Sequence, residues 1–202
     1  MLNAKSKTLL WDRKGPIGPP REIRGRDVMI TVQRPGRIVY LQGPRDGAGL
    51  SSLLASLGAI NLPLSGHSAG DDQTRLLAIT DDSFYLIQQA CEPIVMHFAD
   101  AFDVALNVTD AWTRISVCGR QAIALLAKGC ALDFHSSAFS AGACAAVGFA
   151  QMRTVIWRPR DDFAYHMMIG RSYALSFWDW LLEAGEEYAC MDNPQHTHEV
   201  RL

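Results

Sequence analysis

The stretch ISVCGRQAIALLAKGCALDF, residues 115–134, contains two patterns that predict different structures. It begins with an apolar run typical of a buried strand, and continues over 120–128 with apolar residues at helical spacing. Gly119 separates the two patterns, because glycine accepts the backbone conformations that a tight turn requires. Gly129 is placed to end the helix, and Asp133 is suited to the turn that follows. We therefore interpret the stretch as a strand, a turn and a helix that build the fold rather than bind a ligand.

An earlier stretch, VYLQGPRDGAGLSSLLASLG at residues 39–58, has a similar layout. Its leucines recur at helical spacing after a glycine-rich turn, and Gly58 ends the predicted helix. Each stretch is followed by predicted strands and then by another helix. This weak internal repeat predicts an α+β fold of two similar strand–helix–strand–strand–helix halves, at about 28–107 and 108–190.

Apolar alternation and turn residues predict the remaining elements. In the first half we expect two hairpins, 28–33 with 37–42 and 75–80 with 83–88, followed by a helix at 92–106. In the second half we expect strands at 144–149, 152–158 and 163–169. The last helix is expected to begin after Ser172, a favourable N-cap, and to run to about Tyr188. The segment 66–73 is interpreted as a loop.

Composition limits the class of protein. The chain has 202 residues, of which 49% are hydrophobic, and this suits one domain or two small units that share a core. Its five cysteines form no C-x-x-C pair, and no apolar segment resembles a secretion signal, so we expect reduced thiols in the cytoplasm. No apolar run approaches the roughly 18 residues that span a bilayer. We expect no membrane partner.

Residues 1–27 differ in composition from the rest of the chain. They contain seven Lys or Arg against three acidic residues, a net charge of +4, while the whole chain carries −2. Proline and glycine interrupt the segment, so we expect an extended basic arm that builds no core of its own. A solvated tail is one interpretation. The other is an arm that lies along an acidic partner surface, with Trp11, Arg21 and Arg24 as candidate interface residues.

The last predicted helix is more apolar than one buried face requires. Residues placed 100° apart around its axis give an apolar arc about 220° wide, against about 100° for a typical surface helix. Burial of the whole helix within its own fold explains such an arc. A flank that meets another subunit also explains it, and on that interpretation Tyr173 and Trp180 are candidate interface residues.

Four polar motifs contain residue types found in binding or catalytic sites, but each lacks the further residues that such a site requires. The glycine-rich turn at 43–52 lacks the fingerprint of a phosphate-binding loop. Two other motifs contain residue types of catalytic sites but show no nucleophile paired with a base; they are His67 with Asp71 and Asp72, and Asp133 with His135 and Ser137. The fourth, His196 and His198 with Cys190, does not provide the closed ligand set of a metal site. We predict no catalytic, cofactor-binding or metal-binding residue. Their absence favours a subunit of a larger enzyme.

The C-terminal motifs resemble those of one known family. The resemblance is carried by VTD at 108–110, LLAKGCALD at 125–133, the F-x-x-G-x-C-A turn at 139–145 and RSYALSFWDWLLEA at 171–184. Together these motifs resemble the gamma subunit of heterotetrameric sarcosine oxidase over 108–188. The resemblance is looser over 28–106, where LGAINLP at 57–63 contributes.

The resemblance implies both a fold and a role. The implied fold is similar to the folate-binding part of glycine-cleavage aminomethyltransferases, with residues 28–202 as one gamma-subunit-like domain. Complexes of this family oxidatively demethylate sarcosine to glycine, formaldehyde or methylene-tetrahydrofolate, and hydrogen peroxide. FAD, FMN, NAD and tetrahydrofolate are expected on other subunits, and none is expected on this chain alone. The expected partners are a larger alpha subunit and beta and delta subunits, with this chain as a small non-catalytic structural or assembly subunit.

Three other functions stay open on the sequence. One is a gamma-like subunit of a related demethylase or dehydrogenase that acts on another N-methyl amino acid. A second is a stand-alone folate-binding protein of the same fold. A third is an RNA-binding module that uses residues 1–27. The scattered basic residues of the body predict no nucleic-acid surface there, so we expect no nucleic-acid partner.

Overall fold

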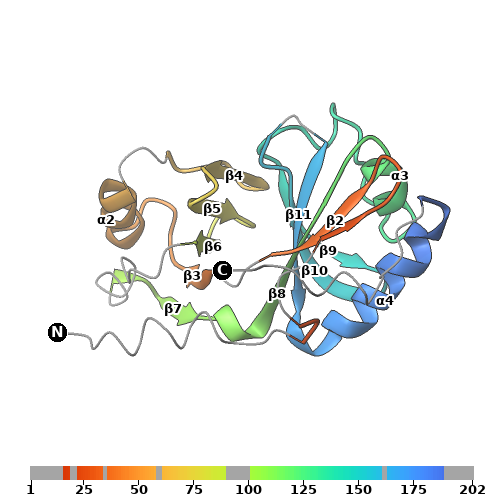
Figure 1. The fold of residues 1–202 in the computed structure, drawn as a ribbon. Coiled ribbons are helices and arrows are strands. Elements are labelled where there is room, and N and C mark those ends of the chain that lie inside the picture. The colour runs from red at the N-terminus through yellow and green to blue at the C-terminus, as the bar shows by residue number, and fades with distance from the viewer. Residues whose placement is uncertain are drawn as a thin grey trace, which may run out of the picture.

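A computed structural model of the chain describes residues 16–18, 22–33, 36–57, 61–89, 101–160 and 163–188. Two antiparallel sheets pack face to face, and helices cover the outer face of each sheet (Figure 1). The layers follow one another as helices, six-stranded sheet, five-stranded sheet and helix. The predicted α+β class is confirmed. In these segments no helix combines the length and apolar character needed to cross a bilayer.

The six-stranded sheet has the strand order β1-β2-β8-β11-β10-β9. Its strands are β1 (Glu22–Arg24), β2 (Met29–Val32), β8 (Trp112–Cys118), β9 (Cys144–Phe149), β10 (Met152–Trp157) and β11 (Ala164–Gly170). Its outer face is covered by α3 (Ala122–Ala127) and α4 (Ala174–Gly185), and α4 is flanked by the 3₁₀ turns η4 (Arg171–Tyr173) and η5 (Glu186–Tyr188). Alternate apolar residues of the strands, such as Ile115 and Val117, share a core with Phe177 and Leu181 of α4.

The five-stranded sheet has the strand order β4-β5-β6-β3-β7. Its strands are β3 (Arg37–Gln42), β4 (His67–Gly70), β5 (Thr74–Ala78), β6 (Ser83–Gln88) and β7 (Val104–Asn107). Helix α2 (Ala48–Leu57) covers its outer face and buries Leu50 and Leu53. The 3₁₀ turn η3 (Thr109–Ala111) connects β7 to β8 in the other sheet.

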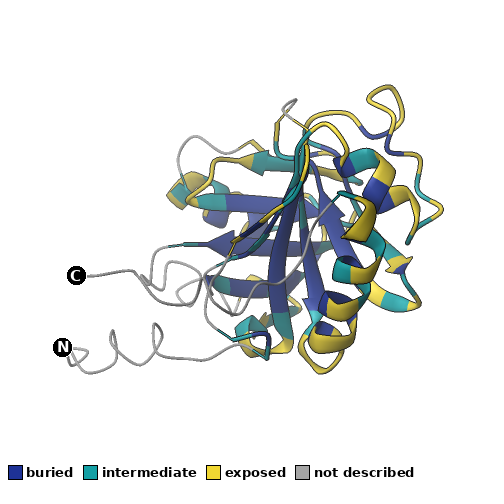
Figure 2. Cartoon of the chain, turned by 45° about the vertical axis from the view of Figure 1, so that its right-hand side comes forward, coloured by how far each residue is buried: buried dark blue, intermediate teal, exposed yellow. Residues whose placement is uncertain are grey.

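A third core fills the layer between the two sheets. It joins Leu77, Tyr85 and Ile87 of one sheet to Trp157 and Met168 of the other. The central strands are therefore buried on both faces, and they appear mostly dark blue in Figure 2, while the helices turn yellow faces to solvent. Burial on both faces explains why these strands are apolar runs instead of alternating segments.

The strand orders of the two sheets are equivalent. The order β4-β5-β6-β3-β7 corresponds to β9-β10-β11-β8-β2. In each sheet a strand leads through a turn into the covering helix, β3 into α2 and β8 into α3. However, β2 comes from the first half of the chain and pairs with β8 of the second half. The six-stranded sheet thus contains strands from both sides of the predicted boundary near residue 107. The division into halves stays a prediction.

One predicted hairpin is wrong and the other is confirmed. Residues 28–33 and 37–42 do form strands, but β2 pairs with β1 and β8 whereas β3 pairs with β6 and β7. The prediction failed because an apolar pattern identifies a strand without identifying its partner. The hairpin of β5 and β6 forms as predicted.

Three other local expectations are wrong. Residues 104–107, at the end of the predicted helix, form the edge strand β7, while 90–100 lie outside the described residues. Residues 67–70, interpreted as part of a loop, form the edge strand β4, whose polar and small residues give no apolar pattern. The N-cap of α4 is Tyr173 instead of Ser172, because η4 precedes the helix. The end of the helical segment at Tyr188 is confirmed.

Gly119 makes the turn that the sequence predicts. Its φ is +114°, in the left-handed region that favours glycine, and an added Cβ would overlap the carbonyl oxygen of Asp27. That same carbonyl accepts a hydrogen bond from the backbone N–H of Gln121 at 3.1 Å. The close approach of the two segments therefore positions the start of α3.

Gly129 follows α3 as predicted. Glycine is needed there because space is short, and not because the backbone is left-handed. Its φ is not in the left-handed region. An added Cβ would overlap the rings of Phe149 and Trp180, so the position has room only for hydrogen. The predicted role of Asp133 in the next turn is confirmed, because its carboxylate accepts the backbone N–H of His135 at 2.9 Å.

Part of the N-terminal arm packs against the body of the chain. Strand β1 pairs with β2 at the edge of the six-stranded sheet, and Ile17 and Ile23 are both buried in the core beneath it. This edge strand was not predicted, because it is only three residues long. Residues 1–15 and 19–21 lie outside the described residues.

Candidate functional site

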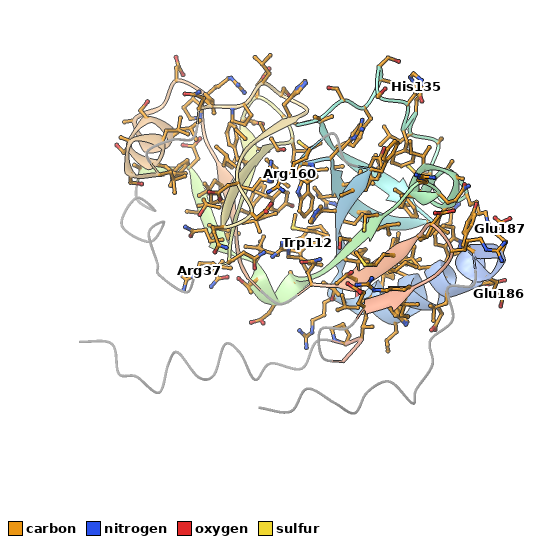
Figure 3. All side chains as sticks on the ribbon, turned by 45° about the horizontal axis from the view of Figure 1, so that its top comes forward. Arg37, Trp112, His135, Arg160, Glu186 and Glu187 are labelled. Atoms are coloured by element: carbon orange, nitrogen blue, oxygen red, sulfur yellow. The ribbon has the colours of Figure 1, made fainter. Side chains whose placement is uncertain are left out.

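A polar cavity of about 350 Å³ lies at one end of the layer between the two sheets. Small-molecule sites in proteins begin at roughly this volume. The cavity forms where β2, β6 and β10 end and where β5 and β11 begin, so both sheets contribute to its wall. Figure 3 shows Arg160 in the space between the sheets. The charged residues of the wall are Asp71, Asp72, Arg75, Arg114 and Arg160.

Arg114 extends into the inter-sheet layer from the middle of β8. It lies opposite Met168 of β11, whose side chain belongs to the inter-sheet core, so the two residues share a face of the sheet. Only 7% of Arg114 is exposed. Burial lowers the pKa of its guanidinium to about 10, and the group therefore stays protonated at neutral pH.

The hydrogen-bonding capacity of Arg114 is only partly used. With the amide of Gln89 turned so that its oxygen faces Arg114, that oxygen accepts from both terminal nitrogens at 3.0 Å. Among the residues that the structure describes, none forms a hydrogen bond with the buried Nε. Across the described segments, no carboxylate pairs with Arg114. A buried charge without a counter-ion is destabilising, so the environment of Arg114 favours an anion.

The opposite wall contains charges that are already paired. Asp72 forms an ion pair with Arg160. Asp71 accepts two backbone N–H bonds of the β4–β5 turn at 2.8 Å each, and these bonds lower the pKa of its carboxyl group. Arg75 donates to a backbone carbonyl at 2.9 Å; burial lowers the pKa of its guanidinium, and the negative charge of Asp72 opposes that shift. Within the described segments, Arg160 is thus paired with Asp72 and Arg75 lies in the field of that carboxylate, whereas no carboxylate pairs with Arg114.

Two flat side chains close one side of the cavity. The rings of Trp157 and His166, from neighbouring strands, stack with centroids 5.4 Å apart and planes inclined by 29°. Nearby, the amide of Gln33 donates to the hydroxyl of Ser116 at 2.7 Å. The described residues contain no group of three or more side chains suited to hold a metal ion. The wall offers a cation, hydrogen-bonding groups and a planar surface, which suits binding of a small anion.

A comparison with protein families identifies the chain's relatives. Residues 55–187 match the family described as "Sarcosine oxidase, gamma subunit family", which is well over half of the chain. The chain belongs to the sarcosine oxidase gamma subunit family. The resemblance seen in the C-terminal motifs is thereby confirmed. Among curated proteins, no sequence matches the chain significantly.

Two solved structures are similar in fold to this gamma-family chain. A chain of the heterotetrameric sarcosine oxidase from Corynebacterium sp. U-96, in complex with pyrrole 2-carboxylate, superposes with a TM-score of 0.75 at 21% identity, covering 85% of this chain and 91% of that chain. The glycine cleavage system aminomethyltransferase T from Bartonella henselae superposes with a TM-score of 0.51 at 16% identity, covering 72% of this chain and 43% of that chain. The predicted similarity to the aminomethyltransferase fold is confirmed.

The predicted interface residues lie in different environments of the gamma-family fold. Trp11 and Arg21 lie outside the described residues. Arg24 is on the edge strand β1 and pairs with Glu22 at 2.5 Å. Tyr173 is 53% exposed at the start of α4. Trp180 packs against the rings of Phe149 and Phe177, with centroid distances of 5.3 and 6.2 Å.

In the part of the chain that the structure describes, the polar motifs of the sequence do not assemble into a catalytic site. His67 does not line the cavity, although Asp71 and Asp72 do. His135 contacts Ser137 at 2.8 Å within one exposed turn, away from Arg160 in Figure 3. Residues 189–202, which include His196, His198 and Cys190 of the motif considered for metal binding, lie outside the described residues.

The cavity was missed by the sequence interpretation, although one signal for it was present. Arg114 interrupts TRISVC, an apolar segment that was correctly predicted as a buried strand. A charged residue inside such a strand is seldom buried without a role, because burial of an unpaired charge is destabilising. Its neighbours Arg75, Gln89 and Trp157 come from distant segments, and no local pattern joins them to Arg114.

Proposed function

We propose that this chain is the gamma-type subunit of a sarcosine-oxidase-type flavoenzyme complex, in which it binds larger subunits and carries no catalytic residue. The observation that carries the proposal is the family match over residues 55–187. The fold likeness to a chain of heterotetrameric sarcosine oxidase, over 91% of that chain, supports it. The enzyme's flavins, NAD and tetrahydrofolate belong to the other subunits in this proposal.

The substrate of the proposed complex is sarcosine, which is demethylated with formation of hydrogen peroxide. Another N-methyl amino acid is the alternative substrate, and this chain does not select between them. The proposed partners are an alpha subunit with beta and delta subunits. A cytoplasmic location fits the free thiols of Cys118, Cys130 and Cys144.

The proposed docking face includes the start of α4 and the edge strand β1. Tyr173 and Leu175 are 53% and 54% exposed, which is high for large apolar side chains of this fold. Arg24 contributes a cation on the exposed edge, where its side chain is 77% exposed. Exposed aromatic and arginine side chains are favoured contacts in protein interfaces.

The test is co-expression of the full chain with candidate large flavoprotein subunits. We expect the chain to elute from size-exclusion chromatography in a large complex with a flavin spectrum. That complex is expected to form peroxide when sarcosine is added. Elution as a colourless monomer with every partner tried would contradict the proposal.

A stand-alone folate-binding protein is the second candidate, favoured by the fold likeness to aminomethyltransferase T. This chain spans only 43% of that enzyme chain, so the likeness includes less than half of a complete folate enzyme. Calorimetric titration of the isolated chain with tetrahydrofolate distinguishes the two candidates. Saturable binding by the isolated chain would favour the second, and absence of binding leaves the subunit proposal standing.

A further inference from the structure

We propose that the cavity between the two sheets binds a small organic carboxylate, with Arg114 as the residue that pairs with the carboxylate group. This inference goes beyond the proposed subunit role, because assembly of a complex does not require a small-molecule site in this chain. It rests on the wall of the cavity and not on the family match.

Arg114 carries a buried charge in the wall of the cavity. Its guanidinium has five N–H donors, and the oxygen of Gln89 uses two of them, one on each terminal nitrogen. No described residue forms a hydrogen bond with Nε, and only 7% of the residue is exposed. A planar carboxylate is the group that matches a guanidinium edge with two parallel hydrogen bonds. Arg114 lines the cavity, and its terminal nitrogens keep N–H donors that Gln89 does not use, so the guanidinium can pair with a carboxylate.

The charges of the wall determine which charge of ligand it favours. Among the described residues of the wall, the three cations Arg75, Arg114 and Arg160 exceed the two anions Asp71 and Asp72 by one positive charge. A single negative charge balances this wall. A second one, as on a phosphate dianion, would lie in the same low-dielectric cavity as the two carboxylates and be repelled by them. The wall thus favours a monocarboxylate over phosphate.

The size of the cavity distinguishes a small molecule from a side chain of a partner subunit. The cavity of about 350 Å³ lies between the sheets and is several times larger than one acidic side chain. Its wall includes the stacked rings of Trp157 and His166 and the apolar side chain of Ile87. A planar or apolar body attached to the carboxylate would fill this space. An inserted Asp or Glu would leave most of it empty.

A guanidinium in this position also requires Gly36. An added Cβ at Gly36 would lie 3.1 Å from Nη1 of Arg114 and 2.5 Å from the carbonyl oxygen of Gln88. The absence of a side chain at Gly36 therefore leaves room for the buried guanidinium. The same backbone proximity fixes the guanidinium in place before any ligand arrives, which lowers the entropic cost of binding.

The test is a ligand-observed NMR titration of the full chain with sodium benzoate, sodium acetate and sodium phosphate at constant ionic strength. Benzoate is the planar carboxylate probe, and acetate lacks the planar body. Arg114→Met removes the charge and keeps the length of the side chain. Arg153→Met is the matched control, because Arg153 is exposed on β10, on the same face as Trp157, and does not line the cavity. Circular dichroism melting confirms that each variant is folded.

We expect saturable benzoate binding by the wild type and by Arg153→Met. We expect binding at least about tenfold weaker for Arg114→Met, since hydrogen bonds to a charged group contribute about 1.5–3 kcal/mol. If Arg114→Met does not fold, intermolecular NOEs between benzoate and the indole of Trp157 in the wild type provide the same test.

Four results would overturn the proposal. These are no saturable carboxylate binding, unchanged benzoate binding by folded Arg114→Met, phosphate bound more tightly than both carboxylates, and the absence of NOEs to Trp157. Loss of partner assembly in Arg114→Met, with no benzoate binding by the wild type, would instead assign Arg114 to an acidic group of the partner. Failure of the subunit proposal is a separate result, because it is measured by co-elution and not by benzoate.

Discussion

Gly119 is the residue on which the turn before α3 depends. Its φ of +114° is strained for any residue with a side chain, and a Cβ there would overlap the carbonyl oxygen of Asp27. We predict that Gly119→Val lowers the free energy of unfolding by about 3 kcal/mol or more, the size of the larger single-residue effects. Urea denaturation followed by circular dichroism measures it.

Gly148 is the matched control for this substitution. It lies in β9, its φ is not positive, and an added Cβ would meet no atom within 4 Å. Gly148→Val, the same substitution within a strand, is expected to change the free energy of unfolding by less than about 1 kcal/mol. Equal stability of the Gly119 and Gly148 variants would contradict the explanation based on backbone strain.

Cys144 illustrates how burial changes the reactivity of a side chain. Burial raises the pKa of its thiol to about 12, against an ordinary value of 9.0. Only about 1 in 10⁴ molecules then carries the reactive thiolate at pH 8. We predict that iodoacetamide at pH 8 modifies the half-exposed Cys118 and Cys130 well before Cys144, as peptide mass spectrometry of the native chain measures. Early modification of Cys144 would show that the inter-sheet layer opens.

The same raised pKa predicts how stability depends on alkaline pH. Between pH 9 and 12 the folded chain keeps the proton of Cys144 while the unfolded chain loses it, so the folded state binds more protons. The contribution of this thiol to stability is therefore complete below pH 9 and is lost as the pH rises above it. Cys144→Ala is expected to reduce the fall in melting temperature between pH 8.5 and pH 10.5. An unchanged fall would contradict the assigned cause.

At the scale of elements, apolar patterns located most strands but not their partners. β3, β6 and β9 begin and end where the sequence places them, because each is an apolar run bounded by turn residues. β4 was missed because its polar and small residues give no apolar pattern, and β7 was missed because its short apolar segment VALN was assigned to the end of a helix. Pairing was not predictable, since β2 and β3 lie in different sheets although a few residues separate them.

Two aromatic residues of the last helical segment, Trp180 and Tyr173, have different environments that the sequence did not distinguish. Trp180 packs on Phe149 and Phe177 and lies beside Gly129, whereas Tyr173 is 53% exposed. We predict that Trp180→Ala lowers the free energy of unfolding of the isolated chain by about 2 kcal/mol, through lost ring contacts and a cavity. Urea denaturation of the isolated chain measures this loss.

Tyr173→Ala is the companion variant on the same helix. It is expected to change the free energy of unfolding by less than about 0.5 kcal/mol. In the proposed complex it is expected to weaken partner binding, measured by co-elution at decreasing concentration. A large loss of stability in Tyr173→Ala, without loss of partner binding, would place Tyr173 in the core and remove it from the docking face.

At the scale of the whole molecule, the sheets are joined by more than side-chain packing. The backbone N–H of Cys144 donates to the carbonyl of Gly66 at 2.7 Å, and that of Ser68 donates to the carbonyl of Gly142 at 2.6 Å. The cavity exists only because the sheets are stacked, and its wall draws on segments from residue 33 to residue 166. Sequence patterns are local, so they predicted most of the strands and helices but not a site formed between the two sheets.

The shared strand β2 leads to a prediction about the two halves of the chain. A fragment of residues 108–202 lacks β2, which leaves the edge of β8 unpaired, and it exposes the inter-sheet face of Trp157 and Met168 to water. We predict that this fragment shows no cooperative thermal unfolding when it is expressed alone. When it is co-expressed with residues 1–107, we expect the two fragments to co-purify and to melt cooperatively, because β2 then pairs with β8 across the break. Calorimetry and size-exclusion chromatography measure both outcomes. Cooperative unfolding of the isolated 108–202 fragment would show that the second half is an independent domain, and that β2 and the inter-sheet core contribute little to its stability.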